Sequence, residues 1–81
     1  MEYSTPVGNN EDIKHLLEGY NSNITSTLQL VADDNNEGTI LVDVAGGNVI
    51  VDTENAVVGD SALATITNGN HMYEVKITVI E

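Results

Sequence analysis

The 81-residue chain contains no cysteine, tryptophan or phenylalanine, and its only proline is Pro6. Without cysteine, neither a disulfide framework nor a cysteine-ligated zinc site can form. With tyrosine as the only large aromatic residue, the hydrophobic core must be thin. A chain of this length forms one small domain that buries only about 60–65% of its unfolded surface. We therefore expect contacts with other subunits or a larger surface to add to its stability.

Positive charge is also scarce. Two Lys+Arg residues stand against 13 Asp+Glu residues, which gives a formal net charge of -11. Such a chain cannot hold nucleic-acid phosphates or an anionic membrane surface through charge, so we expect no direct nucleic-acid partner and no membrane partner. No apolar run approaches the roughly 18–20 residues of a spanning helix. The first six residues do not resemble a secretory signal, because they contain no basic region followed by an apolar run.

The chain is instead rich in Val and Ile, which favour strands. Segments rich in Gly, Asn and Asp divide residues 22–81 into a predicted β-meander. We expect a mainly β fold: a small five-stranded antiparallel β-sandwich or a partly open barrel, with a short N-terminal helix and an extended N-terminal arm. The five expected strands are Ile24–Ala32, Thr39–Ala45, Val49–Thr53, Ser61–Thr67 and His71–Ile80.

Residues 1–9 are expected to form a flexible arm, because Pro6 disfavours helix at the residue before it and glycine and asparagine follow. The main interpretation is a frayed terminus. The alternative is an arm that becomes ordered only against a partner, with Tyr3 as its anchor. In that alternative the partner-binding residues of the arm are Tyr3, Pro6 and Val7.

Residues 10–20 are expected to form a short helix, which joins the β-meander in a single domain, 10–81. Its apolar stripe has helical spacing and consists of Ile13, Leu16, Leu17 and Tyr20. Three helical turns do not persist alone, so this stripe must pack on something. The main interpretation is packing on the domain's own sheet. The alternative is docking on a neighbouring subunit, with Ile13, Leu17 and Tyr20 as further partner-binding residues.

The register of the last hairpin can be predicted from the sequence. If Asn68-Gly69 is a two-residue turn, Thr67 pairs with Asn70. This pairing gathers the apolar side chains of both strands on one face and leaves the polar ones on the other.

An earlier hairpin is predicted to turn at Gly46-Gly47. That turn places Asp43 opposite Ile50, whereas a slip by one residue would place Asp43 directly opposite Asp52. Because like charges directly opposite each other destabilise a sheet, the turn at Gly46-Gly47 is favoured.

The acidic turn Asp33–Gly38 is a candidate for a weakly bound cation. Carboxylate oxygens in a tight loop suit Ca²⁺, and the candidate metal ligands are Asp33, Asp34 and Glu37. The spacing is not that of an EF-hand, because its twelfth position is Val44 and not glutamate. A hydrophilic turn is the better interpretation, and we expect no resident metal and no other cofactor.

Neither histidine indicates catalysis. His15 lies beside Lys14 on the expected helix and is interpreted as solvated. His71 and Glu74 are three residues apart on a strand, so their side chains point to opposite faces and cannot share a ligand. No spacing predicts a nucleophile–base pair, we assign no catalytic residue, and an enzyme is the least expected class.

The organisation of the chain resembles small bacteriophage virion proteins, above all capsid decoration and auxiliary head proteins. The arm Met1–Asn9 and the hairpins at Ala45–Asn48 and Thr67–Asn70 carry this resemblance. It implies a non-enzymatic protein that binds and stabilises a larger protein assembly, often as a homo-oligomer such as a trimer. Its place would be the virion surface, after assembly in the host cytoplasm. The Pro-rich threading arm of some decoration proteins is missing, since Pro6 is the only proline.

The acidic surface supports a second hypothesis, a nucleic-acid mimic that inhibits a basic DNA-binding or nuclease protein. Such a cytoplasmic inhibitor would bind through carboxylates that include Asp43 and Asp52. Dense acidic rows are typical of mimics, and here Asn and Thr dilute the acidic residues, so this hypothesis ranks second. A weak Ca²⁺-binding module that uses the acidic turn ranks third.

Overall fold

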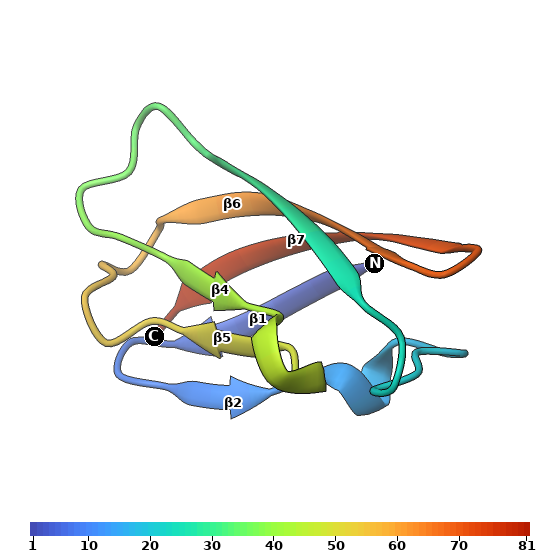
Figure 1. Ribbon diagram of the computed structural model, residues 1–81. Helices are drawn as coiled ribbons and strands as arrows, with labels where there is room; N and C mark the ends of the chain where they lie inside the picture. Colours follow the sequence, from blue (N-terminus) through green and yellow to red (C-terminus); the bar gives the residue numbers. More distant parts are fainter.

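The computed structural model describes all residues, Met1–Glu81, and consists of two β-sheets packed face to face (Figure 1). The four-stranded sheet has the order β1-β7-β6-β3, and the three-stranded sheet has the order β2-β5-β4. No helix in the structure is long and apolar enough to span a membrane. The elements are β1 (Glu2–Pro6), β2 (Asn10–Asp12), the 3-10 turn η1 (Lys14–Leu16), β3 (Ser26–Ala32), β4 (Leu41–Asp43), the 3-10 turn η2 (Ala45–Gly47), β5 (Ile50–Asp52), β6 (Ser61–Asn68) and β7 (His71–Ile80).

The strand order is the one found in an immunoglobulin-type sandwich. The second, fifth and fourth strands share one sheet, and the third, sixth and seventh share the other. The first strand departs from the constant-domain arrangement, because β1 pairs in parallel with β7. The mainly β sandwich is therefore confirmed, but it has seven strands where five were expected, and one of its strand pairs is parallel.

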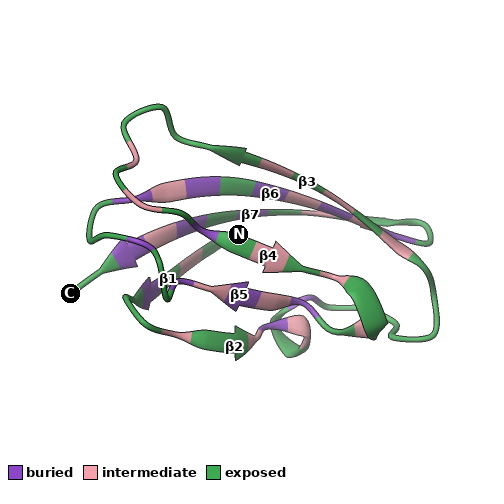
Figure 2. Ribbon diagram, turned by 60° about the vertical axis from the view of Figure 1, so that its left-hand side comes forward, coloured by how far each residue is buried: buried purple, intermediate pink, exposed green.

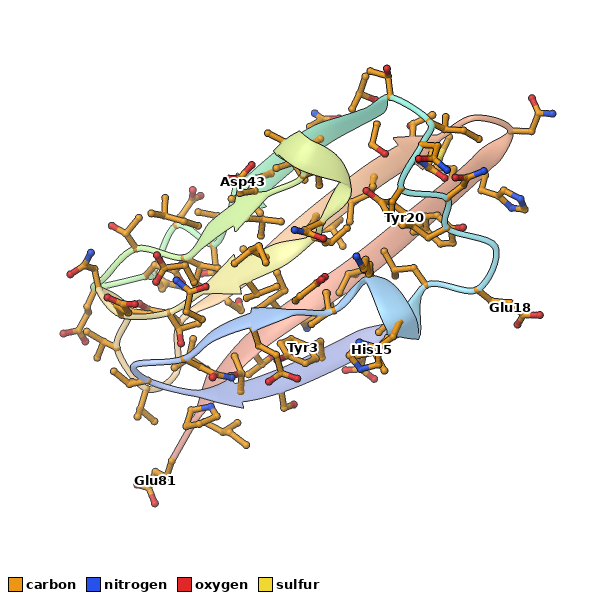
Figure 3. All side chains as sticks on the ribbon, turned by 60° about the horizontal axis from the view of Figure 1, so that its bottom comes forward. Tyr3, His15, Glu18, Tyr20, Asp43 and Glu81 are labelled. Carbon is orange, nitrogen blue, oxygen red and sulfur yellow. The ribbon has the colours of Figure 1, made fainter.

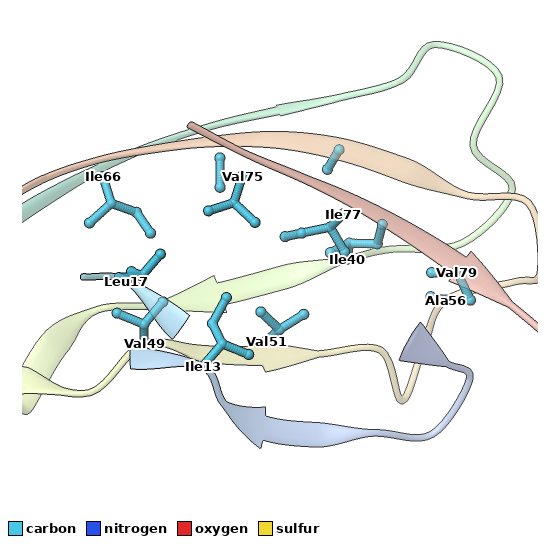
Figure 4. Close-up of a cluster of buried hydrophobic side chains, with 12 residues drawn as sticks. Ile13, Leu17, Ile40, Val49, Val51, Ala56, Ile66, Val75, Ile77 and Val79 are labelled. Carbon is cyan, nitrogen blue, oxygen red and sulfur yellow. The ribbon is translucent and has the colours of Figure 1, made fainter. Parts of the chain in front are cut away.

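Aliphatic side chains from both sheets fill the space between them (Figure 4). Along β7, Val75, Ile77 and Val79 are buried and alternate with outward-facing residues, because successive side chains of a strand point to opposite faces. Figure 2 shows buried positions alternating with more exposed ones along strands of both sheets. One core is thus shared by both layers. Every fully buried side-chain nitrogen and oxygen has a hydrogen-bond partner.

The expected helix over residues 10–20 is wrong. The segment contains the short strand β2 and a single 3-10 turn, Lys14–Leu16. Ile13 and Leu17 are buried in the core, but Leu16 is 44% exposed, so the apolar residues do not form one helical stripe. The segment does pack on the domain's own sheets, as the main interpretation held.

Asp12 ties this segment to the three-stranded sheet. Its Oδ1 accepts the backbone N–H of Lys14 at 3.0 Å and that of Val49 at 3.2 Å. The second bond ties the segment to the residue just before β5. Because a three-turn helix has little stability of its own, these tertiary contacts decide the conformation.

The N-terminal segment is also not a detached arm. Strand β1 pairs with β7 along its whole length. The amino group of Met1 donates to the carbonyl oxygen of Glu74 at 2.8 Å. The phenol of Tyr3 donates to the carboxylate of Glu11 at 3.1 Å and links the first strands of the two sheets at the rim of the sandwich (Figure 3). The segment is extended, as expected, but the sandwich itself is its partner.

The predicted register of the β4–β5 hairpin is confirmed, because Asp43 lies opposite Ile50. The connection contains η2, in which Gly46 and Gly47 have φ values of 75° and 81°. A β-carbon at Gly47 would lie 2.6 Å from the carbonyl oxygen of Ser22. Both the backbone conformation and this close approach therefore require glycine at position 47.

The predicted register of the β6–β7 hairpin is wrong by two residues. Asn68 pairs with His71, so the turn consists of Gly69-Asn70 and not Asn68-Gly69. Gly69 has a φ of 60° at the first central position, as a type II′ turn requires. A slip of two residues keeps the alternation of faces, so the predicted apolar face still points into the core.

Candidate interaction surfaces

The outer face of the four-stranded sheet, called here the neutral face, is rich in hydroxyl, amide and aliphatic side chains. Its charged residues are Glu2, Glu74 and Lys76, so the negative and positive charges on this face nearly balance. The strand register and the alternation of burial define its uncharged members: Ser4, Pro6, Thr27, Gln29, Val31, Ser61, Leu63, Thr65, Thr67, Met72, Thr78 and Ile80.

An aliphatic pair lies on the neutral face where β3 pairs with β6. Val31 pairs with Leu63 across β3 and β6, and Leu63 pairs with Lys76 across β6 and β7. All three residues line a shallow depression of about 430 Å³ that continues to the start of the acidic turn at Asp33 and Asp34. Lys76 forms no salt bridge in the structure. The neutral face thus presents exposed aliphatic surface beside one free ammonium group.

The outer face of the three-stranded sheet, called here the acidic face, has a different character. Lys14 is the lysine beside it, and its Nζ lies 3.7 Å from Asp12 Oδ2 and 2.8 Å from Asn48 Oδ1. Figure 3 shows Asp43 on this side of the molecule. The members of the acidic face are Asn10, Asp12, Leu41, Asp43, Ile50 and Asp52.

Each aspartate of the acidic face also supports the backbone. Asp43 accepts the N–H of Ala45 at 2.8 Å, and Asp52 accepts the N–H of Glu54 at 2.9 Å. Burial alone would raise the pKa of Asp12, but the two backbone N–H donors and the ammonium group of Lys14 lower it by more. The pKa of Asp12 therefore lies below its usual value, and this carboxylate stays charged at neutral pH.

The six predicted partner-binding residues do not form one patch. Ile13 and Leu17 are buried in the core and cannot reach a partner from the folded chain, which corrects that part of the expectation. Tyr3 and Tyr20 are half-buried and pack against the same core. The remaining two have exposed side chains and lie at the end of β1 and just after it: Pro6 and Val7.

The acidic turn is organised as a hydrogen-bonded loop. The carboxylate of Asp33 accepts the N–H of Asn35 at 2.8 Å, as in an Asx turn. The amide group of Asn36 both accepts from the N–H of Ser61 at 2.9 Å and donates to its carbonyl oxygen at 2.8 Å. The structure contains no group of three or more His, Asp or Glu side chains placed to hold a metal ion.

Asp60 is a buried carboxylate that the sequence analysis missed. It accepts the backbone N–H groups of Glu37, Gly38 and Val57, each at 2.9 Å, and so joins the acidic turn to the loop before β6. Burial alone would raise the pKa of Asp60, but the three backbone donors lower it by more. The pKa of Asp60 therefore lies below its usual value. In the sequence nothing distinguishes Asp60 from the other turn aspartates, because two of its partners are more than 20 residues away.

Neither histidine is part of a titratable cluster. His71 lies at the end of the β6–β7 hairpin, where its ring stacks on Tyr73 with 6.0 Å between centroids. The hydroxyl of Tyr73 donates to the carbonyl oxygen of Glu18 at 2.7 Å. His15 is exposed on η1 (Figure 3). Both side chains thus lie at the periphery of the sandwich.

No protein-family model, no curated protein and no solved structure matches the chain. Proteins of unrelated function share the immunoglobulin-type strand order, so this order does not assign an activity. The two outer faces of the sandwich, by contrast, differ in charge and in exposed aliphatic surface.

Proposed function

We propose that the chain is a non-enzymatic structural and binding module that attaches to a larger protein assembly. Within that class, we propose a capsid decoration or auxiliary head protein on the surface of a bacteriophage virion. The contrast between the neutral face and the acidic face carries this proposal. The charges of Glu2, Glu74 and Lys76 nearly balance on the neutral face, so this face can approach a protein lattice with little net repulsion, and the acidic face then points to solvent and keeps particles apart.

The dimensions of the molecule leave room for such a contact. The molecule measures 34 × 20 × 18 Å, so its broad side has an outline of about 700 Å². A stable protein–protein contact buries about 800 Å² on each partner. The aliphatic pair Val31 and Leu63 provides an apolar patch toward the β3 edge, and the threonines of the same face provide polar groups beside it. Ordinary interfaces combine both kinds of group.

The test is co-sedimentation with capsids of the phage whose genome encodes the chain, prepared without this protein. Two exposed leucines on strands provide a matched pair: Leu63, 41% exposed on the neutral face, and Leu41, 49% exposed on the acidic face. We expect saturable binding that Leu63→Glu weakens at least tenfold and Leu41→Glu leaves unchanged. Absence of binding, or equal effects of the two substitutions, would contradict the proposal.

The acidic face favours a second candidate, a cytoplasmic nucleic-acid mimic that inhibits a basic DNA-binding or nuclease protein. Three aspartates gather on one outer face: Asp12, Asp43 and Asp52. This candidate predicts inhibition of a nuclease that weakens steeply with salt, because exposed charges are screened. Asp43→Asn combined with Asp52→Asn should abolish the inhibition, whereas Leu63→Glu should not affect it.

A further inference from the structure

Strand β3 is an open edge of the four-stranded sheet. It pairs only with β6, and Figure 2 shows no strand on its other side. The N–H of Asp33 donates to Ser61 at 3.0 Å, which makes this pair a hydrogen-bonded one. Because hydrogen-bonded pairs alternate in an antiparallel ladder, the odd-numbered residues of β3 bond to β6. The backbone groups of Leu28, Leu30 and Ala32 therefore point away from the sheet.

The other three edges carry features that block pairing with a further strand. Strand β1 ends in Pro6, and β2 and β4 have three residues each, with the acidic residues Asp12 and Asp43 at their ends. Strand β3 has seven residues and contains no proline, glycine or charge. Residues 19–32 contain no charged side chain, in a chain whose net charge is -11. This edge is thus the one at which a strand can be added with the least hindrance.

We propose that β3 pairs with β3 of a second copy of this chain, antiparallel and about a two-fold axis at Gln29. This register uses the whole strand: Leu28 lies opposite Leu30 of the second copy, and Ser26 lies opposite Ala32. It forms about eight backbone hydrogen bonds. It also joins the four-stranded sheet of one copy to that of the other in one continuous sheet. The partly exposed leucines Leu28 and Leu30 of both copies then form one row across the new interface. The contact is isologous, so it produces a dimer and not the trimer suggested by the resemblance.

Local charge does not oppose a second copy at this edge, although the whole chain is acidic. A basic partner would be drawn to the acidic face, whereas a neutral edge is complementary to another neutral strand. In the proposed register, Asp33 lies opposite Thr25 of the second copy. The two Asp33 residues are eight positions apart along the paired strands, which is about 27 Å at roughly 3.4 Å per residue. This separation exceeds the Debye length of about 8 Å at physiological ionic strength, so repulsion between them is screened.

A cysteine at position 29 tests the pairing directly, because the chain has no cysteine of its own. In the proposed dimer, residue 29 lies opposite residue 29 of the second copy, in a non-hydrogen-bonded pair. The Cα atoms of such a pair are about 4.5 Å apart, within the range that a disulfide spans. Under mild oxidation we expect Gln29→Cys to form a covalent dimer in high yield. Thr65→Cys, one strand further in on the same face, and Thr27→Cys, two residues along the same strand, should stay mostly monomeric.

Sedimentation velocity of the unmodified chain completes the test. We expect a concentration-dependent species of twice the chain mass, which Gln29→Lys abolishes and Thr65→Lys retains, because like charges meet at the axis only in the first variant. Far-UV circular dichroism checks that both variants fold, and Gln29→Glu replaces Gln29→Lys if the latter does not. A monomer at all concentrations, or disruption by Thr65→Lys alone, overturns the proposal. The dimer does not depend on the proposed function, since capsid binding can fail while the disulfide forms.

Discussion

Asn68 is predicted to be a residue on which the stability of the sandwich depends. It is 0% exposed, and its side chain ties the segment before β3 to the β6–β7 hairpin. Its Oδ1 accepts the N–H of Asn21 at 2.9 Å, and its Nδ2 donates to the carbonyl oxygen of Asn21 at 3.1 Å and to Ser26 Oγ at 2.7 Å. Asn68→Ala removes these three hydrogen bonds at once, together with a longer one from Nδ2 to the carbonyl oxygen of Ile24 at 3.4 Å.

The size of the effect follows from these contacts. Each neutral hydrogen bond contributes about 1 kcal/mol to stability, so Asn68→Ala should lower the free energy of unfolding by about 3 kcal/mol. A domain of this length has a total stability of roughly 4–12 kcal/mol. The expected fall in Tm is about 12–24 °C, at roughly 4–8 °C per kcal/mol for a domain of this size.

Thermal unfolding followed by circular dichroism measures this effect, and Asn70→Ala is the matched control. Asn70 lies in the same hairpin, but it is exposed and its side chain forms no hydrogen bond within the chain. We expect its replacement to change Tm by only a few degrees, as surface substitutions usually do. If Asn68→Ala lowers Tm no more than Asn70→Ala does, the hydrogen bonds of Asn68 do not contribute measurably to stability, which would refute this prediction.

Two further predictions concern the turns and acid stability. Gly47→Ala should destabilise the fold by about 1–3 kcal/mol more than Gly46→Ala, since both residues have positive φ but only a β-carbon at Gly47 would meet Ser22; equal effects in urea unfolding would exclude the close approach. The pKa of the Asp60 carboxyl is lower in the folded chain than in the unfolded chain, where it is about 3.9. The charged carboxylate therefore stabilises the fold above about pH 3.9, and this stabilisation is lost as the pH falls through the folded pKa. Urea midpoints between pH 7 and pH 2 should therefore converge for the unmodified chain and Asp60→Asn, while Asp34→Asn, at an exposed carboxylate, should follow the unmodified chain throughout.

Much of the strand layout could be predicted from the sequence, because side-chain alternation and turn residues are local signals. Strand β7 was predicted with its observed bounds, and β6 to within one residue. The register of β4–β5 was predicted because it avoids placing Asp43 opposite Asp52. The polar outer face of β6 and β7 was also visible in the alternation. Its extension across β1 and β3 into the neutral face was not, since segments far apart in the sequence form it.

The failures have tertiary causes. Asn68-Gly69 is a strong turn signal, but the side chain of Asn68 bonds to Asn21, 47 residues earlier, and the turn moves to the next pair. Ile13 and Leu17 have helical spacing, yet contacts with the residues around β5 set the conformation of their segment. Pairing of β1 with the last strand leaves no local pattern. In each case a partner distant in the sequence overrides the local preference.

Contact with a capsid, the mode of action proposed for this chain, can be measured by counting its copies in purified particles. Quantitative mass spectrometry of virions from a phage whose genome is shown to carry this sequence measures the ratio of this chain to the major capsid protein. We expect many copies per particle, in a fixed ratio to that protein. A chain that is present in the infected-cell lysate but missing from the purified particles would contradict it.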